Sequence, residues 1–132
     1  MSNKVDASFQ VNSWDEKPFH EIDGGPKLTR ASLTKTFRGD LEGEGTLEYL
    51  MIHGKDGVSS FMGVERVVGS LGGRSGSFVL QHSGTFENGA ATCTWFVVPG
   101  SGTGELGGLT GTGGFESAHA EDYPMTLEYD FE

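Results

Sequence analysis

Apolar and polar residues alternate along most of this chain, whereas the 3.6-residue recurrence of an amphipathic helix is nearly absent. From residue 5 to residue 11 every second side chain is apolar, and the same period of two runs through segments 41–52 and 74–86. This alternation predicts β-strands, because successive side chains of a strand point to opposite faces. We therefore expect an all-β protein with little or no helix.

Turn-forming residues separate the alternating segments. The sequences Asp23-Gly24-Gly25-Pro26, Lys55-Asp56-Gly57, Gly69–Gly73 and Asn88-Gly89 interrupt the pattern. After 14–18, only a short segment, 19–22, is expected before the first of these turns. The expected strands are 5–11, 28–37, 41–52, 58–68, 74–86, 91–98, 107–115 and 125–131.

About eight strands joined by short turns predict a single closed antiparallel β-barrel. Closure pairs every strand edge and so removes the exposed edges of an open sheet. The length of 132 residues fits one domain, and we expect residues 1–132 to form it. The interior of an eight-stranded barrel is filled by side chains or holds one small ligand. A two-sheet sandwich is the alternative fold.

Charge and cysteine content restrict the partners and the compartment. Nine Lys and Arg against 19 Asp and Glu give a net charge of −10, which repels nucleic acid and anionic lipid. The apolar runs are too short to span a bilayer or to direct export. Cys93 is the single cysteine, so an internal disulfide is excluded. We expect a cytoplasmic protein that binds neither nucleic acid nor membrane.

Two titratable residues are candidates for catalysis. His82 shares a strand face with Phe78 and Leu80, and an imidazole desolvated in a pocket can act as acid or base. Glu65 and Arg66 are neighbours of opposite parity, so only one of them faces the interior. We take His82 and Glu65 as the catalytic candidates. The alternative for His82 is a structural histidine that is hydrogen-bonded within the core.

Four residues are candidates for ligand binding, namely Tyr49, Trp95, Phe78 and Arg66. Tyr49 and Trp95 each combine a large apolar area with one polar group, which suits the wall of a ligand pocket. Core filling explains these two aromatic residues equally well.

No metal or cofactor is expected. The histidines, at positions 20, 53, 82 and 119, are scattered, and a single cysteine cannot complete a thiolate cluster. Segment 102–107 matches the dinucleotide-binding pattern G-x-G-x-x-G. That pattern requires a helix to follow, but glycine-rich sequence continues to residue 114 and disfavours one.

Three segments together resemble a known family. They are 37–45 (FRGDLEGEG), 73–85 (GRSGSFVLQHSGT) and 97–111 (VVPGSGTGELGGLTG). Their ordered combination is similar to that of small, functionally uncharacterised bacterial proteins with an allene oxide cyclase-like barrel, and the resemblance spans roughly residues 1–132. It implies an antiparallel barrel. It assigns no catalytic residues here, because fold similarity transfers no chemistry.

Two hypotheses for function follow. The first is a barrel that binds an apolar or aromatic small molecule, with a cyclisation or isomerisation as the fitting chemistry. The second is a non-catalytic structural or interaction protein with a filled barrel and a subunit interface on its outer wall, as in a homo-oligomer. The apolar residues on both faces of segment 91–98 motivate the second hypothesis.

Overall fold

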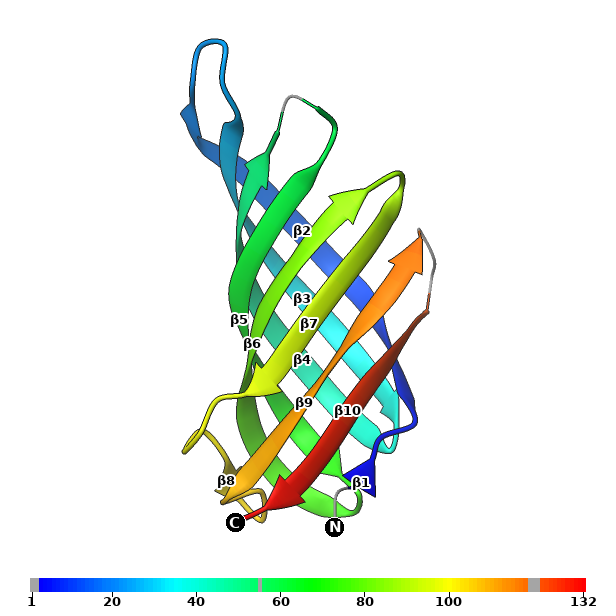
Figure 1. The fold of residues 1–132 in the computed structure, drawn as a ribbon. Coiled ribbons are helices and arrows are strands. Elements are labelled where there is room, and N and C mark those ends of the chain that lie inside the picture. The colour runs from blue at the N-terminus through cyan, green and yellow to red at the C-terminus, as the bar shows by residue number, and fades with distance from the viewer. Residues whose placement is uncertain (1–2, 55, 119–121) are drawn as a thin grey trace.

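The computed structural model describes residues 3–54, 56–118 and 122–132, and within these residues all regular structure is strand. The all-β prediction is confirmed. The strands, shown in Figure 1, are β1 (Asn3–Lys4), β2 (Ala7–Glu21), β3 (Lys27–Gly39), β4 (Leu41–His53), β5 (Ser59–Leu71), β6 (Arg74–Glu87), β7 (Ala90–Val97), β8 (Thr103–Gly104), β9 (Leu109–Ala118) and β10 (Tyr123–Phe131).

The eight long strands form a closed ring. Each pairs antiparallel with its neighbours in the order β2, β3, β4, β5, β6, β7, β9 and β10, and β10 returns to pair with β2. The two short strands are additions, since β1 pairs with β10 and β8 pairs with β6. Circular pairing confirms the barrel and excludes the two-sheet sandwich.

Strand β2 corrects one sequence-based expectation. It continues through Trp14 and Pro18 to Glu21 instead of breaking there. Register shifts between Val11 and Ser13 and between Pro18 and His20 absorb the irregular sequence as bulges. Strand β10 pairs with β2 only at Ala7–Phe9 within the described residues. The proline therefore sits where its missing N–H costs no ladder bond to β10, and the β2–β3 hairpin projects past the rim (Figure 1).

Two tight hairpins set the register of the central strands. Gly72 and Gly73 have φ of 57° and 85°, and Asn88 and Gly89 have φ of 55° and 79°. Positive φ at both central residues is what a type I′ turn requires. The Asn-Gly turn is thus confirmed, whereas β5 runs further than expected, to Leu71. In the predicted turn Lys55-Asp56-Gly57, Lys55 lies outside the described residues.

The glycine-rich segment that matches the dinucleotide pattern lies at one end of the barrel (Figure 1). Instead of starting a helix, this segment forms the short strand β8 and then turns, with Gly104 and Gly108 at φ of 60° and 81°. Leu106 is fully buried in the core, and Glu105 Oε1 accepts a hydrogen bond from the Ser75 amide. Because β8 pairs with β6, the segment extends the wall at this end of the barrel, and Leu106 fills part of the interior there.

Candidate functional site

A cluster of polar side chains from four different strands lies inside the barrel. Lys35 on β3, Tyr49 on β4, Glu65 on β5 and His82 on β6 are each at most 5% exposed. All four occupy inward positions of an otherwise apolar alternation, so their burial follows from the packing of their neighbours. Gly63 pairs with both Tyr49 and His82, and its missing side chain leaves room for the Tyr49 ring.

These side chains are connected by hydrogen bonds and an ion pair. Tyr49 Oη is 3.0 Å from His82 Nδ1, and His82 Nε2 is 2.8 Å from Glu65 Oε1. Lys35 Nζ lies 3.5 Å from the same Glu65 oxygen. An ionised carboxylate only accepts hydrogen bonds, so His82 donates one through Nε2–H to Glu65. Its Nδ1 then accepts a hydrogen bond from the Tyr49 hydroxyl. The chain therefore links Lys35 to the Tyr49 hydroxyl through Glu65 and His82.

Burial and charge pairing shift the pKa values of this cluster. Burial raises the pKa of Glu65, but the Lys35 charge and the His82 hydrogen bond outweigh burial and hold that pKa below 4.5. Burial lowers the pKa of His82 below 6.5, and it lowers the pKa of Lys35 although Glu65 opposes the shift. Burial also raises the pKa of Tyr49 well above its ordinary value. At neutral pH the cluster holds a carboxylate, a neutral imidazole and a neutral phenol.

The Lys35 amine lies among aromatic rings. Its Nζ is 4.1 Å from the ring centroid of Phe9, 5.6 Å from that of Phe115 and 5.8 Å from that of Trp95. Such contacts favour the cationic form of the amine. Across the part of the chain that the structure describes, Lys35 Nζ and Glu65 Oε2 are the buried side-chain polar atoms without a hydrogen-bond partner. Buried polar atoms of this kind are rare, because an unmade bond costs free energy.

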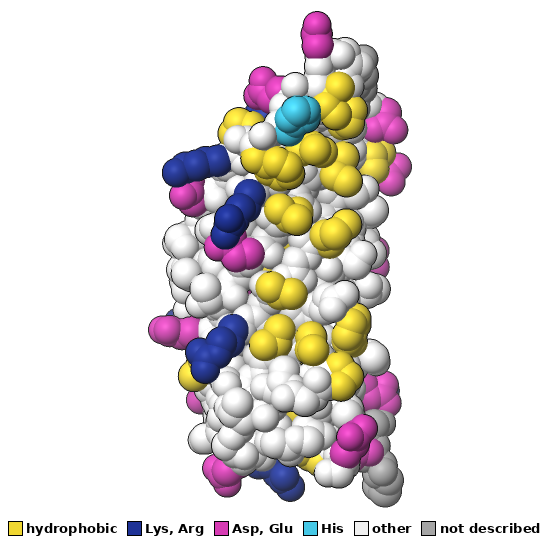
Figure 2. Space-filling view, turned by 90° about the vertical axis from the view of Figure 1, so that its left-hand side faces the viewer, with side chains coloured by type: hydrophobic (Ala, Val, Ile, Leu, Met, Phe, Trp, Pro, Cys, Tyr) yellow, Lys and Arg dark blue, Asp and Glu magenta, His cyan; other side chains and the backbone are white. Residues whose placement is uncertain are grey.

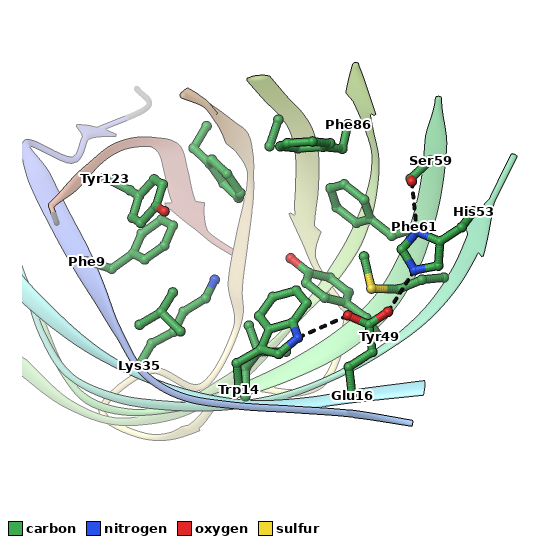
Figure 3. A pocket seen from close by; sticks show the side chains of 15 residues that line it. Phe9, Trp14, Glu16, Lys35, Tyr49, His53, Ser59, Phe61, Phe86 and Tyr123 are labelled. Carbon is green, nitrogen blue, oxygen red and sulfur yellow. Dashed lines mark hydrogen bonds and ion pairs between the residues drawn. The ribbon is translucent and has the colours of Figure 1, made fainter. Parts of the chain in front are cut away.

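A cavity of about 300 Å³ opens from this cluster toward the rim (Figure 3). Lys35 and Tyr49 supply polar groups to its buried part, whereas Glu65 and His82 lie behind the lining. The volume is at the lower end of the range for small-molecule sites. Most of the wall is apolar or aromatic and includes Phe9, Leu33, Met51, Phe61, Phe115 and Tyr123.

A second polar cluster lies at the mouth of the cavity. His53 Nε2 is 2.7 Å from Glu16 Oε2, and His53 Nδ1 is 2.9 Å from Ser59 Oγ. Glu16 also accepts hydrogen bonds from Thr29 and from the Trp14 indole, at 2.7 Å and 3.1 Å. Burial raises the pKa of Glu16, but these hydrogen bonds outweigh burial and lower it. The carboxylate thus fixes the Trp14 ring over the cavity mouth, as Figure 3 shows.

The predicted catalytic pair is brought together, since His82 and Glu65 are in direct contact inside the barrel. Of the predicted ligand-binding residues, Tyr49 lines the cavity. Trp95 is buried beside His82, and its Nε1 donates to the Thr126 carbonyl, so its polar group is used within the protein.

Two predicted ligand-binding residues lie away from the cavity. Phe78 is buried in the core, paired in register with Val67. Arg66, predicted to bind a ligand, does not face the interior. It lies exposed on the outer wall, with Nη2 3.5 Å from Ser77 Oγ. Strand parity explains this position, since Glu65 takes the inward place and the next residue must point outward.

Sequence reasoning did not single out Lys35, Glu16, His53 or Ser59. A signal for Lys35 was present, since this charged residue shares a strand face with Leu33 and Phe37. His53 and Ser59 pair across the predicted hairpin at Gly57. Glu16 lay in a segment that was not predicted to be a strand.

The remaining chemistry-bearing residues form no metal site within the described ranges, where no group of three or more His, Cys, Asp or Glu side chains is placed to hold an ion. His20 is exposed, and His119 lies outside the described residues. Residues 3–54, 56–118 and 122–132 contain no helix long and apolar enough to cross a membrane.

Comparisons with known proteins place the chain in a family. The profile of a family described as "Protein of unknown function (DUF3224)" matches residues 5–129. A crystal structure of a DUF3224 protein with unknown function from Shewanella oneidensis MR-1 is similar, with 35% sequence identity and a TM-score of 0.83 over 100% of this chain and 99% of that one. No curated protein matches the chain. These matches confirm the resemblance to a functionally uncharacterised bacterial family, and the chain belongs to the DUF3224 family.

Proposed function

We propose that this protein binds an apolar or aromatic small molecule in the open end of its barrel. The observation that carries the proposal is a cavity of about 300 Å³ with an aromatic wall and an unsatisfied lysine amine in its buried part. An apolar molecule gains free energy when it leaves water for such a wall. A hydrogen-bond acceptor on the same molecule would satisfy Lys35 Nζ.

The bound molecule has one favoured orientation in this proposal. Its apolar body packs between Phe9 and Phe61, and its polar end points toward Lys35 and Tyr49. A cyclisation or isomerisation would use the Tyr49 hydroxyl as the acid–base group that faces the substrate. Glu65 and His82 would then act as positioning residues, because they orient Tyr49 and set its proton affinity without lining the cavity.

Binding is tested with 2-naphthylmethanol, an aromatic alcohol, titrated into ¹⁵N-labelled protein and followed by NMR. We expect saturable shifts of the amides of Met51, Phe61 and Phe115. The variant Ala91→Phe fills the cavity and should weaken binding at least about tenfold, or ~1.4 kcal/mol. The control Thr92→Phe adds the same ring on the outer face of β7 and should bind as the wild type does.

The proposal fails if the alcohol causes no saturable shifts, or if Ala91→Phe and Thr92→Phe bind it equally well. Unfolding curves of both variants establish that each is folded before the comparison is made.

A second candidate function, association of two copies through the outer wall, has its own observation. Met62 and Val64 on β5 are 53% and 52% exposed. Leu50 on β4 pairs with Met62, so exposed apolar side chains form a band across β4 and β5. Gln81 on β6 pairs with both Val64 and Phe96 and separates this band from Phe96 on β7. Figure 2 shows hydrophobic side chains gathered along the face where β5 lies.

We propose that a second copy of this chain covers this band, because an isologous contact buries the same exposed apolar side chains on both copies. Sedimentation velocity at micromolar concentration should show a dimer that Val64→Glu dissociates. Thr46→Glu on the outer face of β4 is the matched control. A wild-type protein that is monomeric throughout this range contradicts the interface.

A further inference from the structure

We propose that Lys35 is a nucleophile that forms an imine with an apolar or aromatic aldehyde or ketone bound in the cavity. The inference rests on the proposed function, since the carbonyl compound must first enter the barrel. It adds the substrate class and a covalent step at one named atom.

The position of Lys35 Nζ is the first support. Lys35 lines the cavity, its side chain is 2% exposed, and its Nζ lacks a hydrogen-bond partner among the described residues. Figure 3 shows the side chain directed inward from β3, near the ring of Phe9. Four aromatic rings lie within 6.0 Å of Nζ by their centroids, including that of Phe37. A carbonyl group on a flat apolar molecule would meet the amine in this place.

Burial of Lys35 favours the reactive, neutral form of its amine, although Glu65 and the surrounding aromatic rings favour the cation. Only the neutral amine attacks a carbonyl carbon, and lysines in apolar pockets lose their proton more readily than exposed ones. Burial lowers the pKa of Lys35, while Glu65, and Cys93 to a smaller extent, oppose that shift. Glu65 Oε1, at 3.5 Å, is the acceptor positioned to take the ammonium proton.

The reaction balances without an oxidant, a reductant or a further co-reactant. Lys35 Nζ forms a bond to the carbonyl carbon as the C=O π pair moves to oxygen, and one proton passes from nitrogen to that oxygen. Loss of the hydroxyl with the second N–H proton gives the C=N bond and one water. Glu65 takes only the ammonium proton, whereas the Tyr49 hydroxyl, which lines the same cavity, gives a proton to the oxygen and regains one from the nitrogen. The bonds through His82 connect these two groups.

Reductive trapping tests the step. The protein is incubated with 2-naphthaldehyde and sodium cyanoborohydride, which reduces an imine to a stable secondary amine, and the adduct is located by intact mass and peptide mapping. We expect saturable modification of Lys35 at least about tenfold faster than that of exposed Lys17. Equal or slower labelling of Lys35 overturns the proposal.

Two variants keep the test specific. Lys35→Arg keeps the positive charge but removes the amine, so the fast adduct should disappear. Ala91→Phe, which fills the cavity and leaves Lys35 in place, should abolish fast labelling at Lys35 while Lys17 is still modified. If Ala91→Phe leaves the rate at Lys35 unchanged, labelling does not proceed through the cavity and the proposal is wrong.

The alcohol used above separates the two proposals. Saturable binding of 2-naphthylmethanol without trapping of 2-naphthaldehyde at Lys35 overturns imine formation and leaves ligand binding in place. Absence of both overturns both.

Discussion

Tyr49 Oη lies 3.0 Å from His82 Nδ1 inside the barrel, and this bond connects the cavity wall to the buried carboxylate of Glu65. The contact depends on Gly63, which pairs with both residues and adds no side chain between them. The Tyr49 hydroxyl thereby connects the cavity wall, which a ligand would contact, to His82 and Glu65, which a ligand would not contact.

The first prediction concerns this hydroxyl. Among the described residues, Tyr49→Phe leaves His82 Nδ1 with Cys93 Sγ, at 3.5 Å, as its hydrogen-bond partner. We expect the free energy of unfolding to fall by about 1–3 kcal/mol, because a buried acceptor loses its donor. Urea unfolding measures the change. Tyr129→Phe, at a half-buried tyrosine of β10, is the control. An equal loss of stability in both variants would show that the Tyr49–His82 hydrogen bond does not add to the free energy of unfolding.

The second prediction concerns the buried ion pair. Lys35→Met leaves the Glu65 carboxylate without its cation and should cost about 3–5 kcal/mol. The double variant Lys35→Met/Glu65→Leu removes both charges, so its loss should be smaller than the sum of the two single losses by at least about 1 kcal/mol. A double-mutant cycle from denaturant unfolding gives this coupling. Additive losses would mean that the 3.5 Å contact carries no interaction energy.

The third prediction is a loss of stability as the pH falls below 6.5. An unfolded histidine binds a proton near pH 6.5, but burial lowers the pKa of folded His82, so the unfolded state binds more protons just below this pH. The free energy of unfolding should therefore fall, by at most about 1.4 kcal/mol per pH unit for this group. The contribution of ionised Glu65 is present above pH 4.5 and is lost as the pH falls through its lowered folded pKa.

Stability measured against pH tests this sign. His82→Gln should flatten the dependence just below pH 6.5, whereas His20→Gln, on the exposed hairpin, should leave it unchanged. An unaltered slope in His82→Gln would assign the pH dependence to other groups.

The fourth prediction concerns the space occupied by Glu65. A Cβ at Gly45 would collide with Glu65 Oε2 and lie 3.0 Å from Phe37 Cε2. Gly45→Ala should therefore destabilise the protein by about 1–3 kcal/mol, although alanine is not disfavoured by the strand backbone. Gly107→Ala, where a Cβ would meet only the Gly104 carbonyl oxygen at 3.6 Å, should stay within about 0.5 kcal/mol of the wild type. Thermal unfolding compares them, and equal stability would mean that Glu65 can move aside freely.

The fifth prediction concerns the thiol. Burial raises the pKa of Cys93 to about 11, so roughly one molecule in a thousand holds the thiolate at pH 8. Ellman's reagent should label folded protein at least about a hundredfold more slowly than unfolded protein. The thiol introduced by Thr94→Cys in a Cys93→Ala background points outward and should react rapidly. Fast labelling of native Cys93 would contradict its burial.

The sequence could predict the fold class and the inward face of most strands. A period of two requires extended backbone, and one apolar face requires burial, so His82 and Glu65 could be assigned to the interior without coordinates. The contact between His82 and Glu65 could also have been predicted from the sequence. A hairpin centred on Gly72 and Gly73 places Gly63 opposite His82 and Glu65 opposite Leu80, and so makes His82 and Glu65 diagonal neighbours. The turn had been assigned only to the wider segment 69–73.

The β2–β3 hairpin shows where pattern alone was insufficient. Trp14 and Pro18 break the simple alternation, and a broken alternation indicates a turn unless a bulge is known. A bulge shifts every later side chain to the other face, so Glu16 could not be assigned to the cavity mouth from its position in the sequence.

By itself, then, the sequence determined the all-β class and the inward face of most strands, because these depend on local periodicity and on short turns. The pairing of β10 with β2 in the structure decided between the closed ring and the two-sheet sandwich. Only the tertiary structure decided that Lys35 of β3 meets Glu65 of β5 and that an aromatic cavity ends on them. The physical reason is that strands β3 and β5 do not pair with each other. Their side chains meet over Gly45 of β4, whose missing side chain leaves room for Glu65, in an interior whose width is set by the packing of all eight strands together.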